Sequence, residues 1–169
     1  MKHSIVCGVD GSEPSRSAAQ VAARLAHTLN LRLVLAHATE DRPTFPYRDR
    51  RLGELQRRHA IEDGQWLLEG VAAELPGVEP EMRVVLGTPV EALTAVCEEE
   101  AAELLIVGSR GRGPLAAALL GSVSTRLARA AECPVLVVPS PAAAERFLAR
   151  AVHAVDGSAE PERALRVAA

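Results

Sequence analysis

The feature that most limits the fold is a regular alternation of short apolar runs with segments of helical periodicity. Five runs rich in Val, Ile and Leu are each short enough to be a strand. They are Ser4–Val9, Arg32–His37, Met82–Leu86, Leu104–Val107 and Val135–Val138. Their nearly continuous apolar character is typical of strands covered on both faces. Because strands that alternate with helices are joined by right-handed crossovers, the sequence predicts an α/β domain with a five-stranded parallel sheet.

Helical patterns fill the intervals between these runs. In the first interval apolar residues recur at helical spacing from Ala18 to Leu29, with Ser12 suited to the N-cap and Pro14 to the first turn. Apolar residues also recur from Leu52 to Leu75, and shorter patterns precede the fourth and fifth runs. A chain of 169 residues is long enough for one domain of this kind.

The strongest local signal for function follows the fourth predicted strand. Gly108-Ser109-Arg110-Gly111 comes directly after the strand, and after nine more residues Gly121-Ser122-Val123-Ser124 opens the last predicted helix. We expect Gly108 to let the chain turn sharply and Gly111 to let backbone amides approach an anion. Any one glycine taken alone is equally well explained as a turn. Taken together, the set predicts a phosphate cradle.

The second half of this cradle is the start of the last helix. Free N–H groups and the positive end of a helix dipole attract an anion there, and Ser122 and Ser124 add hydroxyl donors. A second interpretation is that Ser122 only caps the helix. Arg110 and Arg112 either neutralise phosphates or are solvated in the loop. The chain has a single lysine, Lys2, and no GxxxxGK[ST] sequence, so it is not a P-loop protein.

Asp10 follows the first predicted strand, in the sequence Val9-Asp10-Gly11-Ser12. If the strand order is 3-2-1-4-5, it reverses between the first and fourth strands, and ligands bind in the crevice at such a point. Asp10 would then lie beside the glycine motif. Its carboxylate suits the nucleoside side of a ligand or a phosphate-bound Mg²⁺. Helix capping is an equally good explanation, and the two roles are compatible.

Composition and charge exclude several classes of function. The net charge is −3, which gives no support to a surface for nucleic acid or for an anionic membrane. The three cysteines, Cys7, Cys97 and Cys133, are far apart in sequence and form no CxxC pair, so we interpret them as inert core thiols. There is no run of 18 apolar residues and no signal-type segment, so we expect a cytoplasmic protein.

An internal repeat marks the end of the chain. Val6-Cys7-Gly8-Val9-Asp10-Gly11-Ser12 returns as Val152-His153-Ala154-Val155-Asp156-Gly157-Ser158, and the likeness continues into the helix that follows. The repeat predicts a domain at 1–140, a linker at 141–150, and the first strand and helix of an incomplete second repeat at 151–169. The second unit is either the stump of a tandem-domain protein or a tail that docks on the first domain or on a partner.

The spacing G-x2-G-x9-G-[ST], matched by Gly108, Gly111, Gly121 and Ser122, resembles the ATP-binding signature of the universal stress protein family. The opening Ile5–Ser12 is similar to the family's first strand and loop, and Cys133–Pro139 to its last strand. The resemblance covers residues 3–139 nearly throughout. It implies the 3-2-1-4-5 sheet with helices on both faces, of the adenine nucleotide alpha hydrolase-like type.

The resemblance also implies a site and a partner. Ala38 would offer backbone groups to adenine, Gly8–Asp10 would border the nucleoside, and the glycine motif would hold ribose and phosphates. Val135–Val138 would pair with a second copy in a homodimer. With the residues that the motif itself suggested, the predicted binding set is Gly8, Val9, Asp10, Ala38, Gly108, Ser109, Arg110, Gly111, Arg112, Gly121, Ser122, Val123 and Ser124.

The function predicted on this basis is an ATP-binding stress-response regulatory module, with or without Mg²⁺. One alternative is a slow ATP hydrolase, for which the sequence offers no well-placed general base beyond Asp10 and His37. The other alternative is a dimerisation module with an empty crevice. The sequence does not name the stress or the signalling partner.

Overall fold

The computed structural model describes residues 3–39, 50–75, 77–109 and 121–139. The predicted residues Arg110, Gly111 and Arg112, the linker at 141–150 and the second repeat at 151–169 lie outside them. The elements are β1 (Ser4–Gly8), α1 (Glu13–Leu29), β2 (Arg32–Thr39), α2 (Arg50–Ala72), β3 (Glu81–Leu86), α3 (Pro89–Glu99), β4 (Ala102–Gly108), α4 (Ser122–Ala130) and β5 (Val135–Val138).

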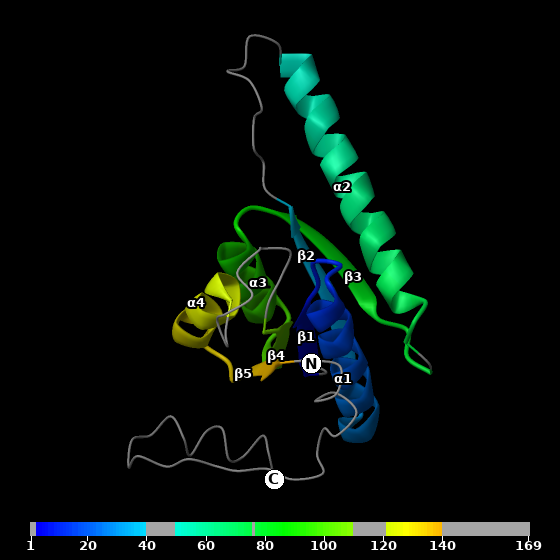
Figure 1. Cartoon of the computed structure of the whole chain (residues 1–169), viewed down its shortest axis with the longest axis vertical. Helices are drawn as coiled ribbons and strands as arrows, with labels where there is room; N and C mark the ends of the chain where they lie inside the picture. Colours follow the sequence, from blue (N-terminus) through cyan, green and yellow to red (C-terminus); the bar gives the residue numbers. More distant parts are fainter. Residues whose placement is uncertain (1–2, 40–49, 76, 110–120, 140–169) are drawn as a thin grey trace.

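All five strands are parallel and lie in the order β3-β2-β1-β4-β5 (Figure 1). The expected fold is therefore confirmed. β1 is central, and every one of its residues is buried. The order reverses between β1 and β4, so the connections from these two strands leave in opposite directions across the sheet and open a crevice at their carboxyl ends.

Helices cover both faces of the sheet, and alternate residues of each strand supply the two cores. On one face Ile5 and Cys7 of β1 pack with α1 and with Leu68 of α2. On the other face Val6 packs with α3 and with Leu127 of α4. Because helices shield both faces from water, most of the strands have the nearly continuous apolar sequences from which they were predicted.

The helix ends follow from local sequence. Ser12 caps α1 by accepting a hydrogen bond from the Ser15 N–H, and Pro14 stands in the first turn. α1 ends where Asn30 adopts the left-handed conformation with a φ of 53°. Thr88 caps α3 in the same way as Ser12 caps α1. These side chains are the stop and start signals that the sequence carries.

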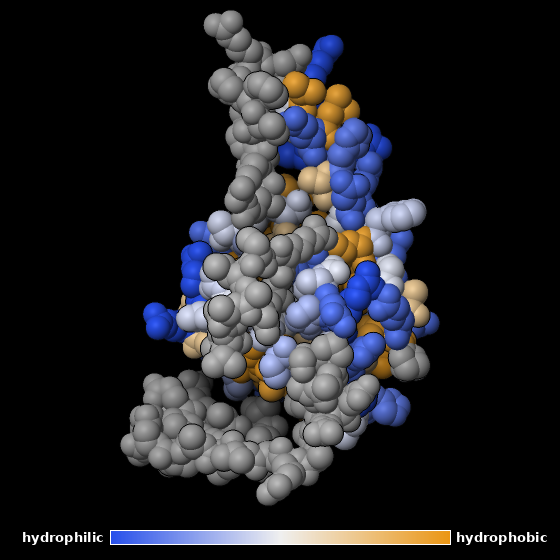
Figure 2. All heavy atoms as spheres, in the orientation of Figure 1, coloured by the Kyte–Doolittle hydropathy of each residue, from blue (hydrophilic) through white to orange (hydrophobic). Residues whose placement is uncertain are grey.

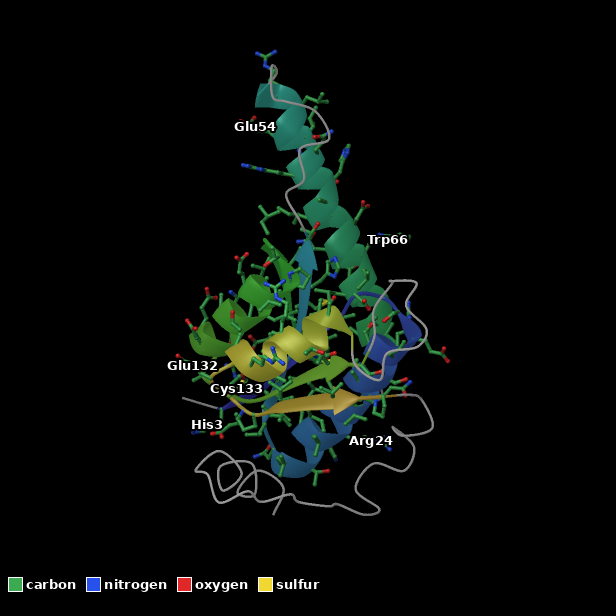
Figure 3. The ribbon with its side chains drawn as sticks, turned by 60° about the vertical axis from the view of Figure 1, so that its left-hand side comes forward. His3, Arg24, Glu54, Trp66, Glu132 and Cys133 are labelled. Carbon is green, nitrogen blue, oxygen red and sulfur yellow. The ribbon has the colours of Figure 1, made fainter. Side chains whose placement is uncertain are left out.

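α2 is the longest described helix and extends past the end of β2 (Figure 1). Its protruding part shows hydrophobic atoms on an otherwise largely hydrophilic surface (Figure 2), and Leu52 and Leu55 are both 52% exposed. Trp66 of the same helix points outward and is 82% exposed (Figure 3). None of the helices in the described ranges has the length and apolarity needed to cross a membrane.

Candidate functional site

A cavity of about 210 Å³ lies at the carboxyl ends of β1, β2 and β4, where the strand order reverses. Its walls come from the ends of these strands, from α3 and from the first turn of α4. The lining residues are Gly8, Val9, Asp10, Ser15, Ala36, His37, Ala38, Pro89, Leu93, Val107, Gly108, Ser109, Gly121, Ser122, Val123 and Ser124.

Ser109 joins the end of β4 to the start of α4. Its carbonyl oxygen accepts hydrogen bonds from the Gly121 N–H at 2.6 Å and from the Ser124 hydroxyl at 3.2 Å. Its own N–H donates to the Val138 carbonyl at 2.8 Å, and its hydroxyl donates to the Pro139 carbonyl at 3.0 Å. Ser109 is 1% exposed, so these bonds are shielded from water. The two segments predicted to converge therefore do so, beside Asp10.

The amino end of α4 has no side-chain cap. Gly121 is the N-cap residue, so Ser122 is the first helical residue, and the predicted capping by Ser122 is wrong. The first N–H groups of a helix lack partners within the helix. Within the described residues, the N–H groups of Ser122 and Val123 make no hydrogen bond to protein. The positive end of this helix therefore faces the cavity with free donors.

Asp10 shapes the loop between β1 and α1. Its Oδ1 atom accepts hydrogen bonds from the Ser12 N–H at 2.9 Å and from the Ser12 hydroxyl at 2.6 Å. The Asp10 N–H donates to the Ser15 hydroxyl at 3.3 Å. Gly11 has a φ of 82°, which only glycine adopts at no steric cost. Asp10 thus orients the residue that caps α1 without itself being the cap.

Glycine is required at position 108 because α1 packs closely against the end of β4. A Cβ atom at this position would lie 2.7 Å from the Pro14 carbonyl carbon and 2.9 Å from the Ser15 nitrogen. Its φ lies outside the left-handed region, so close packing, and not a special backbone conformation, requires glycine here. Gly8 is similar, because its Cβ would lie 2.8 Å from Leu93 Cδ1. Both glycines let helices approach the strand ends closely and so set the width of the cavity.

His37 lines the cavity at the end of β2. Its Nδ1 atom lies 2.7 Å from the Val9 carbonyl oxygen. Because a carbonyl oxygen only accepts, Nδ1 carries the hydrogen and Nε2 is the acceptor of the neutral ring. Gly64 of α2 packs against the ring, since a Cβ there would lie 3.0 Å from His37 Cδ2. The ring is therefore held in one orientation by the Val9 carbonyl and by α2.

The cavity has an apolar part and a polar part. Ala36, Ala38, Pro89, Leu93 and Val107 form the apolar part, between the end of β2 and α3. Asp10, the serines and the free N–H groups of α4 form the polar part. Such a division suits a ligand with a flat apolar portion and an anionic portion. Among the described lining residues, Asp10 is the only carboxylate and none is a lysine or an arginine.

Ten of the thirteen predicted binding residues line this cavity, and the other three, Arg110, Gly111 and Arg112, lie outside the described residues. Sequence reasoning did not place Ser15, Ala36, Pro89, Leu93 or Val107 in the site. Ala36 and Val107 stand beside predicted strand ends, and this position was an available signal. Leu93 reaches the cavity through the packing of α3 on β1, which no local pattern indicates.

Comparison with known proteins gives the family. A sequence model described as the universal stress protein family matches residues 1–139. The chain belongs to the universal stress protein family. A universal stress protein of Mycobacterium tuberculosis is 34% identical to it over 180 residues, which cover 99% of this chain and 59% of the relative. A universal stress protein of Thermus aquaticus is 35% identical over 142 residues, or 82% of this chain and 99% of the relative.

Solved universal stress protein structures share the fold. A universal stress protein in complex with cAMP is 30% identical, with a TM-score of 0.54. The match covers 81% of this chain and 96% of that protein's chain. A universal stress protein from Burkholderia pseudomallei is 27% identical, with a TM-score of 0.63, and the match covers 82% of this chain and 97% of that one. The chain thus spans nearly all of these single-domain relatives but about three fifths of the mycobacterial ones.

Proposed function

We propose that this universal stress protein is a regulatory module that binds an adenine nucleotide, ATP foremost, in the cavity at the carboxyl ends of β1, β2 and β4. The observation that carries the proposal is the uncapped amino end of α4, which faces a cavity that is apolar on its other side. A purine ring and a polyphosphate match these two environments.

The phosphates would lie against the N–H groups of Ser122 and Val123 and the Ser122 hydroxyl. The Ser124 hydroxyl already bonds to the Ser109 and Gly121 carbonyls, so its contribution is to hold the cradle in shape. Gly108 and Ser109 would border the ribose and phosphates. Arg110, Gly111 and Arg112 complete the proposed cradle from the glycine motif, and the arginines would supply the positive charge that the described lining lacks.

The nucleoside would occupy the apolar part of the cavity. Adenine would contact backbone groups of Ala38, and Gly8 and Val9 would form the floor. The second carboxylate oxygen of Asp10 suits a ribose hydroxyl or a Mg²⁺ ion on the phosphates, because both are partners of a carboxylate. The complex with cAMP in a relative that is 30% identical supports an adenine nucleotide as the ligand.

Calorimetric titration of the whole chain tests this function. We expect ATP to bind and adenosine to bind at least about tenfold more weakly, a loss of about 1.4 kcal/mol, because the phosphates make the contacts with α4. GTP should bind more weakly than ATP. The proposal would be contradicted if no adenine nucleotide gave a saturable binding signal at concentrations up to about 1 mM. A Kd of that size corresponds to a binding free energy of only about 4 kcal/mol.

Mass analysis of the ligand released from bound protein separates a regulator from a hydrolase. The regulatory proposal expects ATP to be recovered intact after prolonged incubation. ADP and phosphate formed well above background, and lost in Asp10→Asn, would favour the enzyme.

A homodimer through β5 belongs to the same proposal. β5 is an edge strand of the sheet, and Val135, Leu136 and Val137 are half-buried in the single chain. Edge strands offer unpaired N–H and C=O groups to another strand. Sedimentation equilibrium should give a dimer mass, and Val137→Pro, which removes a donor from the edge, should shift it toward the monomer.

A further inference from the structure

Two of the three cysteines meet in the folded protein, although they are far apart in sequence. Cys97 belongs to the last turns of α3, and Cys133 lies in the bend between α4 and β5, beside Glu132 (Figure 3). The two thiols are near enough for a hydrogen bond between them to shift the pKa of each. Both also line one cavity of about 350 Å³, on the side of the sheet that α3 and α4 cover. The expectation that all three cysteines are inert rested on their spacing alone.

The two thiols are chemically unequal. Cys133 is half-buried, and its pKa is lowered chiefly by the hydrogen bond from the Cys97 thiol. The same hydrogen bond, together with burial, raises the pKa of Cys97. Cys133 is also the more exposed of the two, since Cys97 is only 6% exposed, so we assign the thiolate to Cys133 and the proton-bearing partner to Cys97. Cys7 differs from both, because burial raises its pKa to about 12.

We propose that Cys97 and Cys133 form a peroxide-sensitive dithiol that closes to an intramolecular disulfide. The Cys133 thiolate attacks one oxygen of hydrogen peroxide, the O–O bond breaks, and hydroxide leaves and takes up a proton as water. Cys133 is then a sulfenic acid. The Cys97 sulfur attacks the Cys133 sulfur, the S–O bond breaks, and the second oxygen leaves as water with the Cys97 proton. Two thiols lose two electrons in total, and one peroxide becomes two waters.

The cavity favours a small neutral oxidant. The carboxylates of Glu98 and Glu132 line it together with Thr94, and none of its described lining residues is a lysine or an arginine. A negatively charged disulfide such as oxidised glutathione would be repelled there. A metal ion is not the better occupant, since no group of three or more ligating side chains forms among the described residues.

The disulfide would tie the end of α3 to the start of β5. These elements are not consecutive in the chain. α3 lines the nucleotide cavity through Leu93, and α4, which directly precedes Cys133 and β5, lines it through Ser122. Closure would bring the two sulfurs to the disulfide bond length of about 2.05 Å.

The test treats the full chain with hydrogen peroxide, blocks remaining thiols by alkylation, and maps peptides without reduction. We expect one product, a peptide pair linked through Cys97 and Cys133, in a protein that is lighter by two hydrogen atoms. Cys97→Ser should stop at the sulfenic acid, which dimedone traps on residue 133. Cys133→Ser should react at least about tenfold more slowly, because the remaining buried thiol is scarcely ionised. Cys7→Ala is the matched control and should behave as wild type.

The pH dependence gives a second readout. The oxidation rate of Cys133 should rise with its thiolate fraction and reach half its maximum below the pH of about 8.5 that is typical of a free cysteine. The proposal is overturned if the mapped product lacks the 97–133 link, if the link joins two copies of the chain, or if Cys133→Ser leaves the rate unchanged. Because mapping the wild type needs no variant, a variant that fails to fold leaves the test decisive.

Discussion

Single residues around the nucleotide cavity divide into those that shape it and those that face it. Ser109 and Ser124 form their hydrogen bonds with other protein groups, and these bonds connect the end of β4 to α4. Gly108 contributes by lacking a side chain where α1 approaches. Ser122 and Val123, by contrast, present free N–H groups. Substitutions at the first kind of residue should therefore act on folding, and those at the second kind on binding.

Gly108→Ala should destabilise the fold by about 1–3 kcal/mol, because its Cβ would meet backbone atoms of Pro14 and Ser15 that cannot rotate away. Gly70→Ala is the matched control. A Cβ at Gly70, in exposed α2, meets nothing within 4 Å, so this change should stabilise by about 0.5–1 kcal/mol. Urea unfolding measures both. Equal effects in the two variants would contradict the packing role of Gly108.

Asp10→Ala should cost about 1–3 kcal/mol of stability, because the Ser12 N–H and hydroxyl lose their common acceptor. Asp10→Asn keeps an acceptor oxygen and should retain most of that stability while removing the negative charge. Comparing the two variants by urea unfolding and by ATP titration separates the shaping of the loop from contact with the ligand. If Asn proves as destabilising as Ala, the hydrogen bonds to Ser12 do not account for the role of Asp10.

At the scale of elements, the amino end of α4 is the part of the site with the clearest physical rationale. α1 and α3 begin with side-chain caps from Ser12 and Thr88, whereas the N-cap residue of α4 is Gly121, which has no side chain. We propose that a phosphate of the ligand occupies the position that a side-chain cap takes in α1 and α3. An acidic side chain at that point would compete with the phosphate for the same dipole.

Ser122→Asp should change folding and binding in opposite directions. The new carboxylate lies at the positive end of α4 and should stabilise the fold by about 0.3–1 kcal/mol. It should weaken ATP binding by at least about tenfold, or about 1.4 kcal/mol, through repulsion of the phosphates. Ser122→Ala is the control and should lose only the hydroxyl contact. Thermal unfolding and calorimetry provide the measurements, and undiminished ATP affinity in Ser122→Asp would exclude the phosphate position.

The elements themselves were predictable because the central strands are buried on both faces and therefore apolar along most of their length. The predicted strand Val135–Val138 coincides with β5, and other predicted ends differ by up to three residues, since an apolar pattern does not record where hydrogen bonding stops. The predicted helix at Leu52–Leu75 lies at Arg50–Ala72. The convergence of Asp10 with the glycine motif followed from strand order, whereas Leu93 and the meeting of Cys97 with Cys133 required the packing of α3.

At the scale of the whole molecule, both hydrophobic cores lie within residues 5–138. Because the described residues alone already bury all of β1, we expect removal of residues 140–169 to leave the domain folded. Thermal unfolding of the shortened chain should show a single transition within a few degrees of the full chain, since about 1 kcal/mol corresponds to about 2–8 °C for domains of this size. Insolubility after truncation would mean that the removed segment completes a core.

The most direct measurement is a crystal structure of the full chain grown with a non-hydrolysable ATP analogue. If the proposed site is correct, phosphate oxygens will lie within hydrogen-bonding distance of the Ser122 and Val123 nitrogens, and adenine will lie beside Ala38 and Leu93. An analogue bound elsewhere, or a cavity that stays empty at saturating concentration, would contradict it.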